Sequence, residues 1–364
     1  MSTLNANTEI QMDARRATLN LVAGSLWYAP GSFGIARALS SQYSLRSILF
    51  HEIADRESVF TKGLGVTVTR KQFEAALKFI AKHYTPVSLQ DVLAESDGNP
   101  LPPRPVLLTF DDAYRSVREF AAPMCAELGV PAVFFVNGSC LNNQQLALEN
   151  LICYVTNVRG LDIVNAAIQS VDGAGNLAVG SLLEVFSQFL PATSLQGRQA
   201  FRSALVRLAG VNESELAAEA GLYLSSQQLR DLASFKFEIG NHTYSHANCR
   251  ILFPADFAAE IDRNKAILEE VSGTNVRSFS VPYGSSVDLT SSLAEHLRHE
   301  GYKAVFLAEG RANSSRVHSS RIHDLTPEDL TLDRVSIKAR TDAAFFSEIE
   351  ILPRLRSLRS SLAN

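Results

Sequence analysis

Short apolar runs of strand length alternate with longer helical patterns along most of this 364-residue chain. The candidate strands are RSILFH (46–51), PVLLTF (105–110), AVFFV (132–136), FEIG (237–240), SFSV (278–281), YKAVFL (302–307) and DRVSI (333–337). The run PVLLTF is apolar almost throughout, which is typical of a strand covered on both faces. Because strands and helices alternate repeatedly, the strands are expected to pair in parallel. The pattern predicts an α/β protein with a (β/α) barrel built on seven strands.

The segments between these runs carry the periodicity of amphipathic helices. The segment 69–83 has its apolar residues on one helical face, and a helix is predicted to end near Leu128. Two later helices are expected at 256–271 and 289–300.

One region, residues 142–221, has no strand–helix unit. Its apolar pattern is helical and rich in turns, with helices predicted at 181–190 and 197–209. It is expected to be a helical insertion between two barrel strands. Two interpretations stay open, because an insertion of this length is either a lid or substrate wall or an inert packing appendage.

The chain ends are expected to lie outside the barrel, which we assign to residues 46–340. Residues 1–45 are predicted to form a helical, peripheral segment, and 341–364 a C-terminal helix. The stretch 17–36 has no formal charge, but polar residues and glycines interrupt it too often for a membrane span. It is expected to pack as an amphipathic segment; association with a membrane surface or a partner is the alternative. We find no signal peptide pattern.

Composition narrows the class of protein. The chain is 46% hydrophobic and 20% charged, so it can bury a sizeable core. A net charge of −4 without basic runs argues against a nucleic-acid partner. The four cysteines show no CxxC spacing, which favours a reducing compartment and a cytoplasmic location. Peripheral membrane attachment through 17–36 is left open, and the sequence does not determine the oligomeric state.

Two adjacent carboxylates, Asp111 and Asp112, follow the run PVLLTF directly. In a parallel barrel the chemistry lies at the carboxyl ends of the strands, which is where this pair falls. A helix cap would explain one aspartate but not two.

A pair of histidines, His242 and His246, follows the strand pattern FEIG four residues apart. On a helical turn that spacing would aim both rings the same way. Two histidines, an aspartate and an open position form a hydrolytic metal site, most often for Zn²⁺. The metal would polarise a carbonyl and acidify water. One aspartate then serves as ligand and the other as the base that takes the proton of water.

Two further strand ends carry candidate chemistry. The turn PYG after SFSV could present a backbone N–H to a developing oxyanion, although alone this tripeptide indicates only a turn. His51 ends the first strand, where a general acid or a buried structural histidine are the two interpretations. The sequence HEIAD has Asp55 where a zincin metalloprotease requires a second histidine, which excludes that class.

The set TFDD, HTYSH and PYG, in this order, resembles the polysaccharide deacetylases of carbohydrate esterase family 4, the NodB-homology group. The resemblance covers roughly residues 46–340 apart from the insertion and implies a distorted (β/α)7 barrel. It implies Asp111 as the general base, Asp112, His242 and His246 as metal ligands, and the backbone of Tyr283 as the oxyanion contact. The stretch ILFHEI resembles members with a permuted motif order, as in biofilm exopolysaccharide deacetylases, and implies His51 as the general acid.

The sequence departs from the family pattern at three motifs. The tryptophan motif is missing, since Trp27 is the only tryptophan of the chain. Many members have an arginine that orients the base where Ser280 stands, and a late Leu-x-Leu-x-His motif that LDRVSIKA lacks. Either Arg334 and His51 replace the missing groups, or the site is degraded. Arg321 is the second candidate arginine and His323 the reserve acid.

The resemblance therefore predicts a metal-dependent hydrolase that removes an N-acetyl or similar small N-acyl group from a sugar of a surface glycan or its precursor. Zn²⁺, Ni²⁺ and Co²⁺ all suit these ligands. Two alternatives stay open: a related C–N hydrolase acting on a small amide, and a barrel that binds glycans without catalysis.

Overall fold

The structure is a computed structural model that describes residues 44–95, 99–171, 177–235, 237–313, 330–338 and 340–362. Residues 1–43 of the peripheral segment predicted at 1–45, with the stretch 17–36 among them, lie outside the described residues, as do Arg321 and His323. No helix in the described part of the chain is both long and apolar enough to cross a membrane.

Parallel strands close into a barrel at the centre of the molecule. Its strands are β1 (Arg46–Phe50), β5 (Pro105–Phe110), β6 (Ala132–Val136), β7 (Glu238–Asn241), β8 (Ser278–Ser280), β9 (Ala304–Leu307) and β10 (Leu330–Ser336). The order is β1–β10–β9–β8–β7–β6–β5, and β5 pairs again with β1. β4 (Thr85–Pro86) adds to the start of β5, and β2 (Glu52–Ile53) pairs with β3 (Thr67–Val68). The predicted seven-stranded α/β barrel is confirmed.

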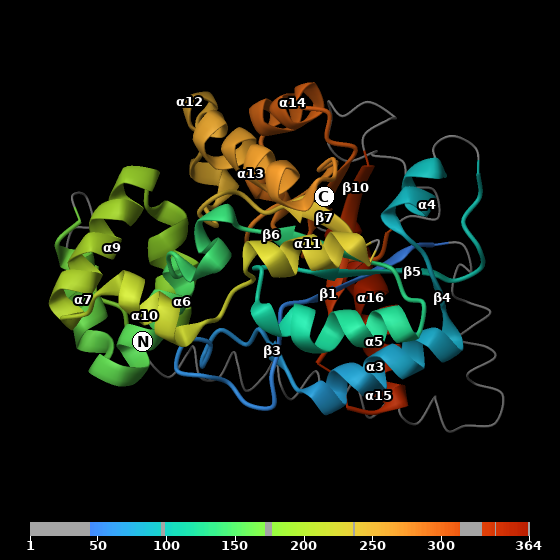
Figure 1. The fold of residues 1–364 in the computed structure, drawn as a ribbon, viewed down its shortest axis with the longest axis horizontal. Coiled ribbons are helices and arrows are strands. Elements are labelled where there is room, and N and C mark those ends of the chain that lie inside the picture. The colour runs from blue at the N-terminus through green and yellow to red at the C-terminus, as the bar shows by residue number, and fades with distance from the viewer. Residues whose placement is uncertain are drawn as a thin grey trace.

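Helices surround the barrel (Figure 1). Outside the insertion they are α3 (Arg70–His83), α4 (Leu89–Ala94), η1 (Val117–Ala121), α5 (Ala122–Glu127), η2 (Gly138–Asn143), α11 (Ser226–Ser234), η5 (Cys249–Ile251), α12 (Pro254–Phe257), η6 (Ala258–Asp262), α13 (Arg263–Ser272), η7 (Ser286–Asp288), α14 (Ser291–His299), α15 (Asp342–Phe346), η8 (Ser347–Ile351) and α16 (Leu352–Leu362). Helix α3 shows why they form: Thr69 and Gln72 make a reciprocal capping box, and Phe73, Leu77 and Ile80 are buried against the barrel core.

The region between β6 and β7 is helical. Its elements are α6 (Leu148–Arg159), α7 (Leu161–Gln169), α8 (Leu182–Glu184), η3 (Val185–Phe189), η4 (Leu190–Ala192), α9 (Leu195–Ala209) and α10 (Glu213–Ala220). Helices α6, α7, α9 and α10 gather at one side of the barrel, opposite α4 (Figure 1). The domain limits expected from the sequence stay predictions.

Alternate residues of β5 face the barrel interior, as strand geometry requires. Val106 and Leu108 pack in the outer core beneath the helices, whereas Leu107 belongs to the interior cluster. Asp111 follows Leu107 and Thr109 in the same alternation. The inward face of β5 therefore ends in a carboxylate at the carboxyl end of the barrel.

Candidate active site

Three turns at the carboxyl ends of strands hold their backbone in the left-handed region. Asp112 and Ala113 follow β5, Thr243 and His246 follow β7, and Tyr283 follows β8, all with φ between 56° and 70°. Such residues cost on the order of 1–3 kcal/mol each and persist where the surrounding structure holds them. The strain is concentrated in the turns that contain TFDD, HTYSH and PYG.

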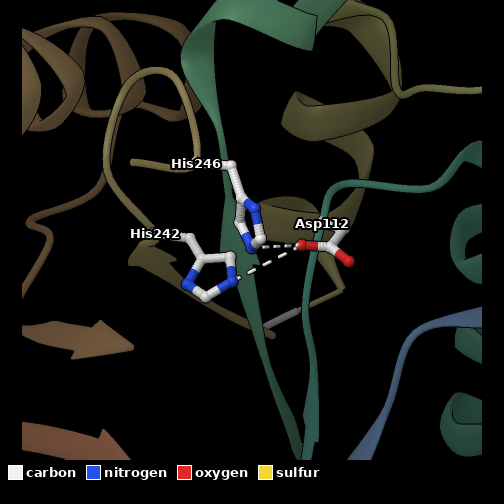
Figure 2. Close-up of side chains that lie close together, drawn as sticks. All are labelled: Asp112, His242 and His246. Carbon is white, nitrogen blue, oxygen red and sulfur yellow. Dashed lines mark ion pairs between the residues drawn. The ribbon is translucent and has the colours of Figure 1, made fainter. Parts of the chain in front are cut away.

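Asp112, His242 and His246 converge on one point (Figure 2). Oδ1 of Asp112 lies 3.4 Å from Nε2 of His242 and 3.4 Å from Nε2 of His246. The three ligand atoms all lie within 4.8 Å of one another. The two predicted histidines and one of the two aspartates are thus brought together.

This group fits a divalent metal ion. Ligands at roughly 2.0–2.2 Å from a tetrahedral ion stand about 3.4 Å apart, and two nitrogens with one carboxylate oxygen suit zinc. The distribution of charge also suits a bound cation. Arg334 pairs with Asp111 and Arg198 pairs with Glu149, whereas Asp112 faces imidazoles. The pKa of Asp112 lies well below its usual value: burial alone would raise it, but His246 and His242 outweigh that effect.

The histidine pair does not lie on a helical turn, contrary to the basis of the prediction. The segment from His242 to His246 is an irregular loop with two left-handed residues. The rings nevertheless lie with their centroids 5.0 Å apart. Backbone strain in the loop, and not helical periodicity, therefore brings together two rings that are four residues apart.

His242 is oriented by the barrel itself. Its Nδ1 lies 2.8 Å from the carbonyl oxygen of Ser280 on β8. A carbonyl only accepts, so Nδ1 carries the proton and Nε2 is left free on the side of Asp112.

Asp111 is held by Arg334 in a two-pronged ion pair. Nη1 and Nη2 of Arg334 donate to Oδ1 and Oδ2 of Asp111 at 2.6 and 2.8 Å. The remaining guanidinium protons go to the hydroxyl oxygens of Ser280 and Thr109 and to the carbonyl of Leu307, so all five donors have partners. Burial would raise the pKa of Asp111, but Arg334 and His242 lower it below the usual value and keep the carboxylate ionised.

Arg334 projects from a strand of the barrel. It lies inside β10, in register with Ser47, and it is 1% exposed. Ser47 is also in register with Leu107, four residues before Asp111, so the arginine side chain extends toward the carboxyl end of the barrel to reach that carboxylate. The carboxylate of the neighbouring Asp333 accepts from backbone N–H groups, including those of Gly310 and Arg311. The small Ser280 leaves room for the guanidinium.

His51 lies beside Asp111 at the end of β1. The strand pairing of Phe50 with Phe110 continues toward the carboxyl end of the barrel, since the Asp111 N–H donates to the Phe50 carbonyl at 3.0 Å. The partly buried His51 side chain lines the same cavity as the metal-ligand group. Burial lowers its pKa below 6.5, although the carboxylates of Asp112 and Asp111 oppose this change.

Tyr283 contributes more than its backbone. Its N–H donates to no backbone carbonyl within the described residues, and the next residue, Gly284, has φ +72°. A Cβ at Gly284 would lie 2.6 Å from the nitrogen of Ala308, so only glycine fits this turn. The Tyr283 hydroxyl donates to Glu149, which no motif had indicated.

Glu149 and Arg198 come from the insertion and were not identified from the sequence. Nη2 of Arg198 donates to Oε1 of Glu149 at 3.1 Å, and Oε2 of Glu149 lies 3.3 Å from Nδ1 of His246. Burial would raise the pKa of Glu149, but His246 and Arg198 lower it to about 2. Burial would likewise lower the pKa of His246, but Glu149 and Asp112 raise it to about 9. The available signal was a charged residue inside the apolar run LALENLICYV.

A cavity of about 350 Å³ lies over these groups. Its wall includes the site residues together with Leu64 and Val66 after β2, and Leu183 and Phe186 from the insertion. A second cavity of about 520 Å³ shares His51 and Arg334 with it. The insertion therefore forms part of the wall around the metal-ligand group.

Two solved structures share the fold. The Streptococcus pyogenes deacetylase PplD, solved with acetate, matches with a TM-score of 0.53 at 14% identity, covering 84% of this chain and 98% of that protein. IcaB from Ammonifex degensii matches with a TM-score of 0.50 at 19% identity, covering 86% of this chain and 96% of its own. No curated protein sequence matches this chain.

The sequence model of the polysaccharide deacetylase family matches residues 98–181 and 189–305, which together are more than half of the chain. The matched ranges contain the TFDD, HTYSH and PYG turns, whereas His51 and Arg334 lie outside them. With the barrel and the converging Asp–His–His group, this match shows that the chain belongs to the polysaccharide deacetylase family.

Proposed function

We propose that the protein is a divalent-metal-dependent N-deacetylase that acts on an N-acetylated sugar of a surface glycan or its precursor. The observation that carries this proposal is the division of the two adjacent aspartates. Asp112 faces two imidazoles, whereas Asp111 is clamped by Arg334. One carboxylate is thus suited to binding a cation and its neighbour to accepting a proton.

Asp112, His242 and His246 would hold the metal ion, with Zn²⁺, Ni²⁺ and Co²⁺ as the candidates. A bound divalent ion polarises the amide carbonyl and makes water a better nucleophile. The carbonyl of Ser280 keeps Nε2 of His242 directed at this position.

Asp111 is the general base. It accepts a proton at its carboxylate as the oxygen of water attacks the acetyl carbon. Arg334 keeps Asp111 ionised between turnovers and fixes its plane through two parallel hydrogen bonds. The arginine that the family usually carries at the position of Ser280 is thereby replaced from β10.

The backbone N–H of Tyr283 stabilises the oxyanion that forms on the acetyl carbonyl oxygen when water adds to the acetyl carbon. His51 then gives a proton to the leaving nitrogen as the C–N bond breaks, so that acetate and a free amine result. His51 directly follows the N-terminal strand β1, which supports the permuted motif order of the exopolysaccharide deacetylase-like group. The proton taken by Asp111 returns to solvent or to His51 to complete the cycle.

The cavity supports a sugar-sized substrate. Its volume of about 350 Å³ lies within the roughly 300–1,000 Å³ of small-molecule sites. The apolar side chains of Leu64, Val66 and Phe186 provide contact surface, and the polar groups converge at one end.

The test is a mass-spectrometric screen of N-acetylated glycans and of lipid- and nucleotide-linked N-acetyl sugars, using protein loaded with each candidate metal. We expect loss of one acetyl group from at least one substrate class, and no reaction with His242→Ala, which should also lose its metal. A small amide substrate turned over in place of every sugar would identify the alternative C–N hydrolase. Stoichiometric metal binding without turnover of any substrate in the panel would contradict the proposal.

A further inference from the structure

Glu149 occupies the first turn of α6 and is buried at 7% exposure, next to the metal-ligand group. One of its oxygens, Oε1, accepts from the Tyr283 hydroxyl and from Arg198. The other, Oε2, points to Nδ1 of His246 at 3.3 Å. Among the described residues these two buried atoms, Oε2 and Nδ1, have no hydrogen-bond partner of standard geometry, and each faces the other.

The environment of His242 shows what such a contact does. There Nδ1 lies 2.8 Å from the Ser280 carbonyl, and Nε2 faces Asp112. His246 has the same arrangement, with Nε2 toward Asp112 and Nδ1 toward Glu149. Each ring has one acceptor behind it, but the acceptor for His242 belongs to the barrel and that for His246 to the insertion.

We propose that Glu149 is a positioning residue that the insertion supplies to the metal centre, where it orients His246 and increases the basicity of its Nε2. This inference rests on the proposed metal-dependent function. A hydrogen bond from Nδ1–H to a carboxylate fixes the tautomer and the ring plane, so the ligand nitrogen has a lone pair directed at the ion. The insertion is thereby a structural part of the site and not an appendage to the barrel.

Arg198 on α9 holds this arrangement together. It is 5% exposed, and its guanidinium contacts the Glu149 carboxylate, the Tyr283 hydroxyl at 3.3 Å and the carbonyl of His246 at 3.3 Å. It neutralises Glu149, so the carboxylate stays buried beside Asp112 without an uncompensated charge. Two helices of the insertion are therefore tied to both the HTYSH loop and the PYG turn.

The experiment measures the affinity of metal-free protein for Zn²⁺ by competition with a chelating indicator, independently of any substrate. Glu149→Gln keeps the shape of the side chain and removes its charge. We expect its Zn²⁺ affinity to fall by about 10–100-fold, the scale typical of lost partners of metal ligands. The matched control is Glu213→Gln, which also removes a glutamate paired with an arginine inside the insertion, Arg202, and should bind Zn²⁺ like the wild type.

Arg198→Lys is the second variant, in case Glu149→Gln does not fold. Lysine keeps the charge but cannot make the same set of contacts, so we expect a smaller loss of Zn²⁺ affinity. Wild-type affinity in a folded Glu149→Gln or Arg198→Lys protein would overturn the inference while leaving the proposed function intact. A wild-type protein that binds none of the candidate metals would instead refute the metal site itself.

Discussion

Two buried arginine–carboxylate pairs lie at opposite ends of the barrel, and their arginines come from the neighbouring strands β10 and β1. Arg334 on β10 binds Asp111 at the carboxyl end, and Arg46 at the start of β1 binds Glu350 in η8. Both arginines reach both oxygens of their partner, at 2.6 and 2.8 Å in the first pair and 2.9 and 3.1 Å in the second. Pairing and burial alone do not distinguish them.

The surroundings of the two carboxylates distinguish the two pairs. Glu350 also accepts from Tyr84 and from Arg354, and the space beside it is a cavity of only about 20 Å³. Asp111 accepts one further, weaker hydrogen bond within the described part of the chain, from Ser280 at 3.2 Å, and it borders the 350 Å³ cavity. A buried ion pair is therefore no sign of function by itself. A carboxylate that can still accept a hydrogen bond from a molecule in an accessible cavity is a sign of function.

The largest effect on rate is expected for the base. Asp111→Asn should lower the deacetylation rate by roughly 10²–10⁴-fold and retain the metal, because the amide cannot take up the proton. Metal content and initial rates are the two measurements. Asp112→Asn is the matched change and should empty the site; if the two results are exchanged, the roles of the aspartates are reversed.

The acid should have the next largest effect. His51→Ala is expected to reduce the rate by about 10²-fold while metal content and fold are unchanged. An acid must be protonated, so activity falls as the pH rises through its pKa, and burial sets that pKa below 6.5. The pH–rate profile of His51→Ala should therefore lack this alkaline limb. A variant that keeps both the limb and the wild-type rate would exclude His51 as the acid.

The clamp on the base should matter less than the base. Arg334→Lys keeps a cation but loses the two-pronged contact, and the rate should fall on the order of 10-fold to 10²-fold without loss of metal, as for a misplaced catalytic group. Arg334→Ala should be more severe, and adding Ser280→Arg should restore part of the rate by supplying the cation from β8. No recovery in a folded double variant, together with a wild-type rate in Arg334→Lys, would show that the pair is structural.

The smallest effect on rate is expected at the opposite end of the barrel. Glu350→Gln should leave turnover unchanged and reduce the free energy of unfolding by on the order of 3 kcal/mol, because it removes the charge of a carboxylate that holds the buried Arg46 through two hydrogen bonds. Burial would raise the pKa of Glu350, but Arg46 lowers it below 4.5. Its stabilising effect is thus complete above pH 4.5 and is lost as the pH falls below that value.

Denaturant unfolding of Glu350→Gln and wild type at several pH values measures this difference. Glu74→Gln, which removes an exposed pair with Lys78, is the control and should unfold like the wild type. A strong loss of activity in folded Glu350→Gln would remove the distinction between the two ends.

The strands of the barrel could be predicted because their signal is local. Runs such as PVLLTF are apolar since both faces are covered, and the observed β5 has the predicted bounds. The adjacency of Asp111 and Asp112, and their place after a strand, could also be inferred without coordinates. The helical explanation for His242 and His246 was wrong because the sequence does not reveal a loop held in left-handed conformations.

The sequence by itself determined the class of fold, the strand ends that carry the motifs and the Asp–His–His group that could hold a metal ion. Tertiary structure alone decided which distant side chains complete that group. Arg334 reaches Asp111 across 223 residues because barrel closure puts β10 beside β1, and β1 beside β5. Glu149 reaches His246 because the first turn of α6 lies at the cavity that the strand ends line. Hydrophobic periodicity reports which face of an element is buried, but the partner of a buried charge depends on strand register and helix packing, which no local pattern encodes.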